Sequence, residues 1–314
     1  MPDLERGRAT DMDETLTVVI PAFNERDSLE RNLPQWLAWC ASQRARLIVV
    51  DDGSSDGSLE VLARHLRNRR LRVLRHRSNR GYGEAVKTGI YHAESAYVAT
   101  MDADGQHVIE DIGALLAVLL DQDADLVIGS RANAPADGAY RRLGKTVIRS
   151  IARALFRARI RDLNSGMKVY RTPLAQRLLP FCPSSMAFSD VITLTYLNQN
   201  CLVIEAPIQV RPRKTGHSTI NTMTAVETVV EIVNVLVGFR PLKVFLPLSG
   251  LLIAAGGLWA VPFLALGRGL SGVALMLITT GLMAGMVGLL AEQVAAARRV
   301  DLSDVAAREV TSRR

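Results

Sequence analysis

The segment Met101–His107, which reads Met-Asp-Ala-Asp-Gly-Gln-His, contains the residues of this chain best suited to chemistry. It follows the apolar run Ala96–Thr100, which is typical of the end of a β-strand. Side chains alternate between the two faces of a strand, so Asp102 and Asp104 are predicted to point the same way. Two carboxylates placed like this suit a divalent cation that is held against a diphosphate. Gln106 adds a third oxygen if the chain stays extended.

Short apolar runs alternate with helical patterns from Thr15 to about residue 130. Strands are expected at Leu16–Ile20, Leu47–Val50, Arg72–Leu74, Tyr97–Met101 and Leu126–Ile128, and helices at Ser28–Cys40, Ser58–Arg67, Gly83–Ser95 and Ile109–Asp121. This alternation predicts an α/β fold in which helices cover both faces of a parallel sheet. Ligands bind such sheets at the carboxyl ends of the strands. The motifs Pro21–Glu25, Asp51–Ser54 and Asp102–Gln106 all follow predicted strands, so we expect one site at this edge.

Two apolar segments near the C-terminus, residues 244–267 and 270–291, are each long enough to cross a bilayer. Gly267-Arg268-Gly269 separates them, and we interpret residues 242–293 as a transmembrane hairpin rather than a pair of buried core helices. Basic residues flank the hairpin on both sides, and only Arg268 lies at its tip. The positive-inside rule then predicts a multi-pass protein of the cell membrane, with the catalytic domain and both termini in the cytoplasm. Residues 1–14 and 294–314 are predicted to be a disordered tail and a cytoplasmic tail.

The chain is basic, with a formal net charge of +7, and part of this charge is concentrated in one stretch. Residues 139–161 hold eight basic residues and no acidic one, at helical spacing, which favours an amphipathic helix on an anionic membrane surface. A solvated helix face is the alternative. Residues 221–241 have apolar residues at helical spacing and are predicted to form an interfacial amphipathic helix. No aromatic residues are interleaved with the basic ones, so we do not expect nucleic-acid binding.

Four motifs in sequence order resemble those of the family 2 glycosyltransferases. They are Val19–Glu25, Val49–Gly57, Asn79–Gly83 and the Asp102/Asp104 segment. Within that family, Arg161–Gly166 and the C-terminal hairpin are similar to the polyprenyl-phosphate glycosyltransferases, the group of dolichol-phosphate mannose synthase. The resemblance covers about residues 15–220 and implies a GT-A fold, a Rossmann-like domain that binds a nucleotide sugar through Mg²⁺ or Mn²⁺.

The resemblance also implies a role for each matching residue. Pro21, Phe23, Glu25, Val50, Asp51 and Asp52 are expected around the nucleoside, with the choice between the last two aspartates left open. Asp102, Asp104 and Gln106 are expected to bind the metal, with Ala103 also at the nucleotide sugar. Arg131 and Arg213 are expected on phosphates, and Arg161 and Ser165 on the phosphate of the lipid acceptor. Asp104, Arg131, Arg161 and Ser165 are the predicted catalytic residues.

The implied reaction is the inverting transfer of a single sugar from a UDP- or GDP-sugar to a polyprenyl phosphate. A membrane-tethered transferase with a glycan or glycolipid hydroxyl acceptor is the first alternative, and it would use Asp190 as its base. A non-catalytic GT-A scaffold subunit is the second alternative. The small residues Gly281, Ala284, Gly285 and Gly288 predict packing between hairpins, and hence a homo-oligomer.

Overall fold

A computed structural model of the chain describes residues 15–131, 160, 162–211, 238 and 241–297. Contacts divide the chain into two compact units, one of residues 1–218 with 302–314 and one of residues 219–301, and each is described by itself. The predicted basic stretch 139–161 lies outside the described residues except for Ile160, as does nearly all of the interfacial helix 221–241. The predicted tail 1–14 also lies outside them, as does the predicted tail 294–314 apart from residues 294–297, which belong to the last described helix.

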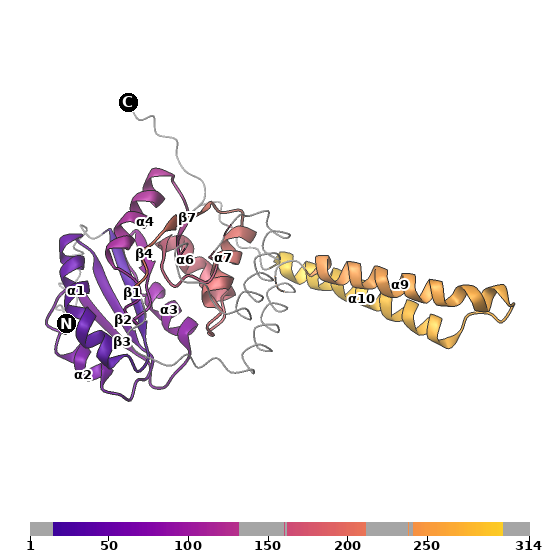
Figure 1. Cartoon of the computed structure of the whole chain (residues 1–314), viewed down its shortest axis with the longest axis horizontal. Coiled ribbons are helices and arrows are strands. Elements are labelled where there is room, and N and C mark those ends of the chain that lie inside the picture. The colour runs from indigo at the N-terminus through magenta and orange to yellow at the C-terminus, as the bar shows by residue number, and fades with distance from the viewer. Residues whose placement is uncertain (1–14, 132–159, 161, 212–237, 239–240, 298–314) are drawn as a thin grey trace, which may run out of the picture. The chain divides into compact units, whose positions relative to one another are not determined.

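The first unit is built on a seven-stranded sheet in the order β3-β2-β1-β4-β6-β5-β7 (Figure 1). The strands are β1 (Leu16–Ala22), β2 (Arg46–Asp51), β3 (Leu71–Arg75), β4 (Tyr97–Thr100), β5 (Leu126–Ser130), β6 (Lys168–Arg171) and β7 (Val203–Pro207). The helices are α1 (Arg26–Ser42), α2 (Ser58–Ala63), α3 (Tyr82–Tyr91), α4 (Glu110–Asp121), α6 (Thr172–Leu178), a 3-10 turn η1 (Leu179–Phe181) and α7 (Phe188–Asn198). Each of the five predicted strands is present, with ends that differ by one or two residues.

Helices cover both faces of the sheet, as predicted, and the strand sequences explain why. Every residue of β1 is buried, and Val18, Ile20 and Val127 pack in one core with apolar residues of α1 and α4. Val19 points to the opposite face, where the lack of a side chain at Gly89 lets α3 lie directly against it. Strands buried on both faces consist of continuous apolar residues rather than alternating ones.

The sheet is not purely parallel, so that part of the prediction was wrong. Strand β6 runs antiparallel to β4 on one side and to β5 on the other, with Lys168 opposite both Thr100 and Ile128. An antiparallel strand begins at the edge where its parallel neighbours end. The residues just before β6 therefore lie beside the residues just after β4 and β5, which brings the segment 162–166 to the edge that carries the predicted site.

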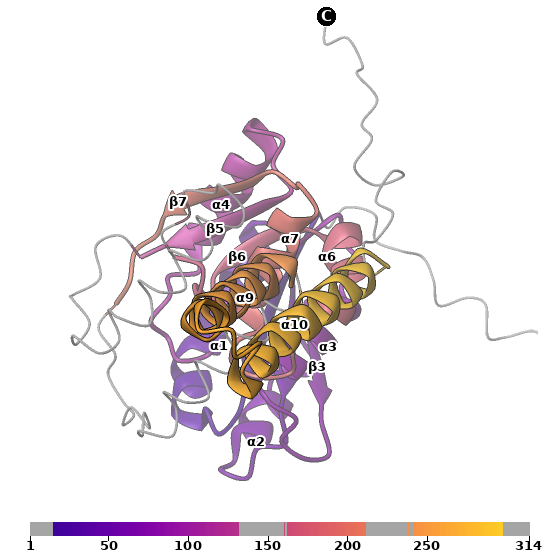
Figure 2. The same cartoon turned by 90° about the vertical axis from the view of Figure 1, so that its right-hand side faces the viewer.

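The second unit is a helical hairpin of α9 (Leu242–Ala265) and α10 (Gly272–Ala297) (Figure 2). Both helices are long and apolar enough to span a membrane. Their mean hydropathy over an 18-residue segment is 2.0 for α9 and 2.1 for α10. Only 17% of each segment is buried inside the protein, unlike the core helices of a soluble domain. Gly267 and Gly269 adopt positive φ angles of 69° and 70° in the turn, as the Gly-Arg-Gly sequence predicts.

Glycines hold the two hairpin helices close together. An added Cβ would lie 2.7 Å from Ile253 Cγ1 at Gly281 and 2.5 Å from Phe245 Cβ at Gly288. These residues therefore face α9 of the same hairpin, which differs from the expectation that they join different hairpins. The homo-oligomer stays a prediction, but these glycines no longer support it because they pack within one hairpin.

Two adjacent glycines of α9 allow a matched test of this packing. At Gly256 an added Cβ would lie 2.8 Å from Ile278 Cγ1 of α10, whereas at Gly257 nothing lies within 4 Å. We expect Gly256→Ala to destabilise the hairpin by about 1–3 kcal/mol through overpacking. Gly257→Ala should be neutral or slightly stabilising, because Ala favours a helix. Thermal unfolding of the detergent-solubilised protein would measure the difference, and equal midpoints would contradict this packing.

Candidate active site

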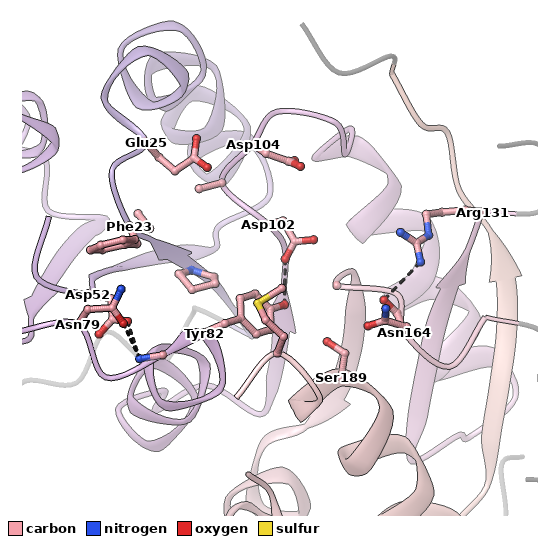
Figure 3. Close-up of a pocket in the computed structure, with 16 residues that line it drawn as sticks. Phe23, Glu25, Asp52, Asn79, Tyr82, Asp102, Asp104, Arg131, Asn164 and Ser189 are labelled. Carbon is pink, nitrogen blue, oxygen red and sulfur yellow. Dashed lines mark hydrogen bonds between the residues drawn. The ribbon is translucent and has the colours of Figure 1, made fainter. Parts of the chain in front are cut away.

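A cavity of about 550 Å³ opens at the carboxyl edge of the sheet, where the sequence predicts the site (Figure 3). Eight predicted site residues line it: Pro21, Phe23, Glu25, Asp52, Asp102, Ala103, Asp104 and Arg131. Four others, Val50, Asp51, Gln106 and Ser165, do not line it. Arg161 and Arg213 lie outside the described residues.

The loop after β1 forms one wall of the cavity. Phe23 is 44% exposed and lines the cavity, so its ring is accessible for stacking. Asn24 has a positive φ of 54°, and its backbone N–H donates to Ser54 Oγ at 2.9 Å. Its side-chain oxygen accepts from the Ser55 N–H at 2.9 Å. These two bonds fix the loop after β1 to the loop after β2.

The structure distinguishes the two aspartates after β2. The Asp52 carboxylate lines the cavity and accepts hydrogen bonds from the backbone N–H groups of Arg80 and Gly81, both at 2.9 Å. It also contacts His76 Nδ1 at 2.6 Å. Asp51 is fully buried and lies 3.5 Å from the Arg75 guanidinium, away from the cavity.

Val50 and Asp51, expected around the nucleoside, do not line the cavity. Asp51 supports the loop, since its Oδ1 accepts from the Ser54 N–H at 3.2 Å. The side chains of Val50 and Asp51 have no exposed surface, because β2 is covered on both faces up to its last residue. Asp52 is the first side chain after that strand to reach the cavity.

Asp102 and Asp104 line the same cavity, and each carboxylate accepts a hydrogen bond. Asp102 Oδ1 accepts from the Tyr82 hydroxyl at 2.9 Å. Desolvation and, next, the Asp102 carboxylate raise the pKa of Tyr82 well above its usual value, so the phenol stays protonated and donates. Asp104 Oδ1 accepts from the backbone N–H of Gln106 at 3.0 Å.

The expectation that the chain stays extended to Gln106 was wrong. Strand β4 ends at Thr100, and a turn follows in which Gly105 has a positive φ of 73°. This turn takes Gln106 away from the cavity lining. Among the described residues, no three His, Cys, Asp or Glu side chains are grouped to hold a metal. Two carboxylates still suit Mg²⁺ or Mn²⁺ when substrate phosphates and water complete the coordination, as is usual for Mg²⁺.

Arg131, at the end of β5, lines the opposite wall with its guanidinium held by Asp162. Its Nε and Nη2 donate to the two Asp162 oxygens at 2.8 and 2.9 Å, and Nη2 also donates to the Asn164 carbonyl at 3.3 Å. This bidentate pair orients the guanidinium strongly. The guanidinium fork that the sequence assigned to a phosphate is thus engaged with Asp162, and phosphate binding by Arg131 stays a prediction.

The segment before β6 contributes Asn164 and Gly166 to the cavity, but not Ser165 between them. Ser165 is fully buried, and its hydroxyl lies 3.4 Å from the Met167 carbonyl. This differs from the expectation that Ser165 grips the acceptor. A Cβ at Gly166 would overlap the Asp102 carboxylate, so the lack of a side chain there leaves room for Asp102.

Sequence reasoning missed several lining residues. Asn79, Gly81 and Tyr82 lie in the quoted motif Asn79–Gly83, which gave the signal but no role. Met186 and Ser189 come from the loop before α7 and its first turn. No local pattern marks these two residues, because only the folded sheet brings α7 to this edge.

Tyr82→Phe should lower sugar transfer by about tenfold to 100-fold, with weaker metal dependence, because outer hydrogen bonds orient metal-binding carboxylates. The variant removes only the hydroxyl that donates to Asp102. Initial rates at a series of Mn²⁺ concentrations would measure the effect. Tyr91→Phe is the control, since Tyr91 is 71% exposed at the end of α3, and it should behave as wild type. Unchanged Mn²⁺ dependence in Tyr82→Phe would contradict this role.

Comparisons with known proteins agree with this geometry. The family Glycosyl transferase family 2 matches residues 17–187, and the GtrB C-terminal hairpin matches residues 240–297. An undecaprenyl-phosphate 4-deoxy-4-formamido-L-arabinose transferase of Edwardsiella ictaluri is 29% identical over 236 residues, which cover 73% of this chain and 71% of that protein. The protein of the same name from Photorhabdus laumondii is 27% identical, covering 80% and 76%.

Among solved structures, the glucosyl-3-phosphoglycerate synthase of Mycobacterium tuberculosis has a similar fold. Its complex with Mn²⁺, UDP-glucose and phosphoglyceric acid aligns with a TM-score of 0.54 at 17% identity, over 71% of this chain and 79% of that one. At this identity the likeness bears on the fold alone. The family match covers more than half of the sequence and includes every residue that lines the cavity except Ser189. The chain belongs to glycosyl transferase family 2.

Proposed function

We propose that this protein transfers one sugar from a nucleotide sugar to a polyprenyl phosphate at the membrane, with inversion at the anomeric carbon. The observation that carries the proposal is the combination, in one chain, of a two-carboxylate cavity with a hairpin of the GtrB type. The two transferases compared above are similar in sequence and are named for undecaprenyl phosphate. The product is a lipid-linked sugar that serves as a donor in a later reaction.

The nucleoside end of the donor is assigned to the wall formed by Phe23 and Asp52. An exposed aromatic ring suits stacking on a base. The Asp52 carboxylate is already held by two backbone N–H groups, so it presents a fixed acceptor toward the ribose or base. Pro21 and Glu25 line the same wall and complete the pocket.

The diphosphate is assigned to the Asp102 and Asp104 end of the cavity. A bound Mg²⁺ or Mn²⁺ supplies neutralisation of the charge that develops on the leaving diphosphate. Asp102 and Asp104 would hold the ion, and Arg131 adds a positive charge that Asp162 keeps in place. Preorganised charges of this kind require no rearrangement during the reaction.

The acceptor needs no strong general base when it is a phosphate. A phosphate monoester has a second pKa of about 6 and is largely ionised at neutral pH. Positioning then dominates catalysis. Arg161 and Arg213, outside the described residues, stay predicted ligands of the acceptor and donor phosphates. A hydroxyl acceptor would require a base such as Asp190, but Ser189 and not Asp190 lines the cavity.

The hairpin is assigned to anchoring the enzyme where its acceptor resides. A polyprenyl chain stays in the bilayer, so the active site must work at the membrane surface. The basic flanks of the hairpin, Arg240 and Lys243 before it and Arg298 and Arg299 after it, favour a cytoplasmic location for both ends and for the catalytic domain. Lipid would then cover the exposed apolar side chains of α9 and α10.

Purified protein in nanodiscs with Mn²⁺, undecaprenyl phosphate and a panel of radiolabelled UDP- and GDP-sugars tests the proposal. We expect label from one donor to move into the organic phase, which also identifies the sugar. Donor binding without lipid labelling by any donor would contradict the proposal. It would favour the hydroxyl-acceptor alternative, whose test is loss of transfer in Asp190→Asn.

A further inference from the structure

Lys168, the first residue of β6, is a lysine with no exposed surface. Lysine is rarely buried completely unless its ammonium is paired or hydrogen-bonded. Its Nζ donates to the Leu163 carbonyl at 3.0 Å and also to the Ser189 carbonyl. The ammonium therefore links the segment before β6 to the first turn of α7.

Those two segments form one side of the cavity. Leu163 precedes Asn164 and Gly166, which line the cavity, and Ser189 lines it from the first turn of α7. Figure 3 shows Asn164, Ser189 and Arg131 together on one side and Phe23 and Asp52 on the other. Lys168 itself is absent from the lining and lies behind the first side. It therefore acts on the site only through the groups that it holds.

Acidic groups surround the ammonium. Burial lowers the pKa of Lys168 to about 8, while the carboxylates of Asp190, then Asp162, then Asp102 raise it. The positive charge of the Arg131 guanidinium lowers the pKa of Lys168, as burial does. Lys168 thus supplies positive charge beneath a group of carboxylates, two of which, Asp162 and Asp102, hold or form the cavity wall.

We propose that Lys168 is a positioning residue for the acceptor half of the active site. Its buried ammonium fixes the spacing between the 163–166 segment and the start of α7, and it offsets the negative charge of Asp162 and Asp190 where an anionic acceptor must approach. This inference rests on the proposed function, because it assigns the Asn164 and Ser189 side of the cavity to the acceptor phosphate. In the part of the chain that the structure describes, the hydrogen bonds of Asp52 go to His76, Arg80 and Gly81 and not to Lys168, so the nucleoside wall should work without this lysine.

Lys168→Met and Lys168→Gln in the full-length protein in nanodiscs test this role. Lys168→Met removes both the charge and the donors, and Lys168→Gln keeps a donor without the charge. We expect kcat/KM for undecaprenyl phosphate to fall by about tenfold to 100-fold in both, since a misplacement of 1 Å is sufficient for such a loss. The dissociation constant for the nucleoside monophosphate of the active donor, measured without metal, should change by less than about threefold, because this ligand occupies the Phe23 and Asp52 wall and not the Asp102 and Asp104 end of the cavity.

Thr193→Val is the matched control. Its hydroxyl donates to the same Ser189 carbonyl at 3.1 Å and is also buried, but it carries no charge. This variant should retain wild-type kcat/KM for the acceptor. A similar loss in Thr193→Val would assign the effect to the hydrogen bonding of that carbonyl and would overturn the role of the ammonium.

Acceptor kinetics of both Lys168 variants equal to wild type would overturn the inference. Loss of nucleotide binding in both variants would overturn it as well, because Lys168 would then support the whole domain and not one side of the site. A wild-type enzyme that labels no polyprenyl phosphate would be a failure of the proposed function, and it would remove this inference too. Unchanged acceptor kinetics in variants of an active enzyme would be a failure of the inference alone.

Discussion

Asp102→Asn and Asp104→Asn are each expected to lower sugar transfer by about 100-fold to 1000-fold, the range measured when one preorganised stabilising group is removed. Both carboxylates line the cavity from the turn after β4. Asparagine has nearly the same shape but no negative charge, so it would weaken the hold on a divalent cation. Initial rates of lipid labelling at saturating Mn²⁺ would measure the loss.

Asp121→Asn is the control for these variants. Asp121 is exposed at the C-terminal end of α4 and does not line the cavity, so Asp121→Asn should retain wild-type activity. If Asp102→Asn and Asp104→Asn also retained full activity, the cavity carboxylates would have no part in the chemistry.

Gly166→Ala is expected to cost at least about 100-fold in transfer, since small displacements of reacting groups have effects of this size. A Cβ at this position would overlap the Asp102 carboxylate. The backbone carbonyl of Gly166 itself accepts a hydrogen bond from the Thr100 hydroxyl at 2.9 Å. The segment cannot move away without breaking that bond. Asp102 would therefore have to leave its hydrogen bond with Tyr82.

The matched control is Gly113→Ala in α4, where the nearest atom to an added Cβ is Trp39 Cζ2 at 3.7 Å. That distance is an ordinary contact, so the variant should be active and no less stable than wild type. Wild-type transfer by Gly166→Ala would mean that Asp102 tolerates displacement, and it would argue against a metal ligand at that position.

The sequence predicted β1, β2, β4 and β5 from their apolar runs, and β3 although arginines interrupt it, but it missed β7, which pairs parallel to β5. Strand β6 was missed for a physical reason. It has four residues and begins with Lys168, which reads as a surface residue until its two carbonyl partners are known. Its antiparallel direction also breaks the strand–helix alternation from which the other strands were inferred.

Motif position was a better guide to the cavity than residue type. Asp51 and Asp52 are chemically identical, but the last residue of β2 is buried and the next one reaches the cavity. At Ser165 and Gly166 the polar residue is buried and the glycine lines the cavity. One-residue differences of this kind depend on where a strand ends, which sequence patterns locate only within a residue or two.

The hairpin was the clearest prediction, since length and apolarity alone determine whether a helix can span a bilayer. What the sequence did not reveal was the partner of its small residues. Gly281 and Gly288 fit equally well into a contact within one hairpin or between two, and only the packing of α9 on α10 distinguishes these arrangements.

The central claim is that the phosphate of a polyprenyl phosphate is the nucleophile. The most direct measurement is the ³¹P NMR spectrum of undecaprenyl phosphate incubated with the protein, diamagnetic Mg²⁺ and the active nucleotide sugar. We expect the phosphomonoester resonance of undecaprenyl phosphate to be replaced by the phosphodiester resonance of the glycosylated lipid. With Asp104→Asn we expect no such change. A monoester resonance that persists while the wild-type protein consumes the nucleotide sugar would contradict the central claim.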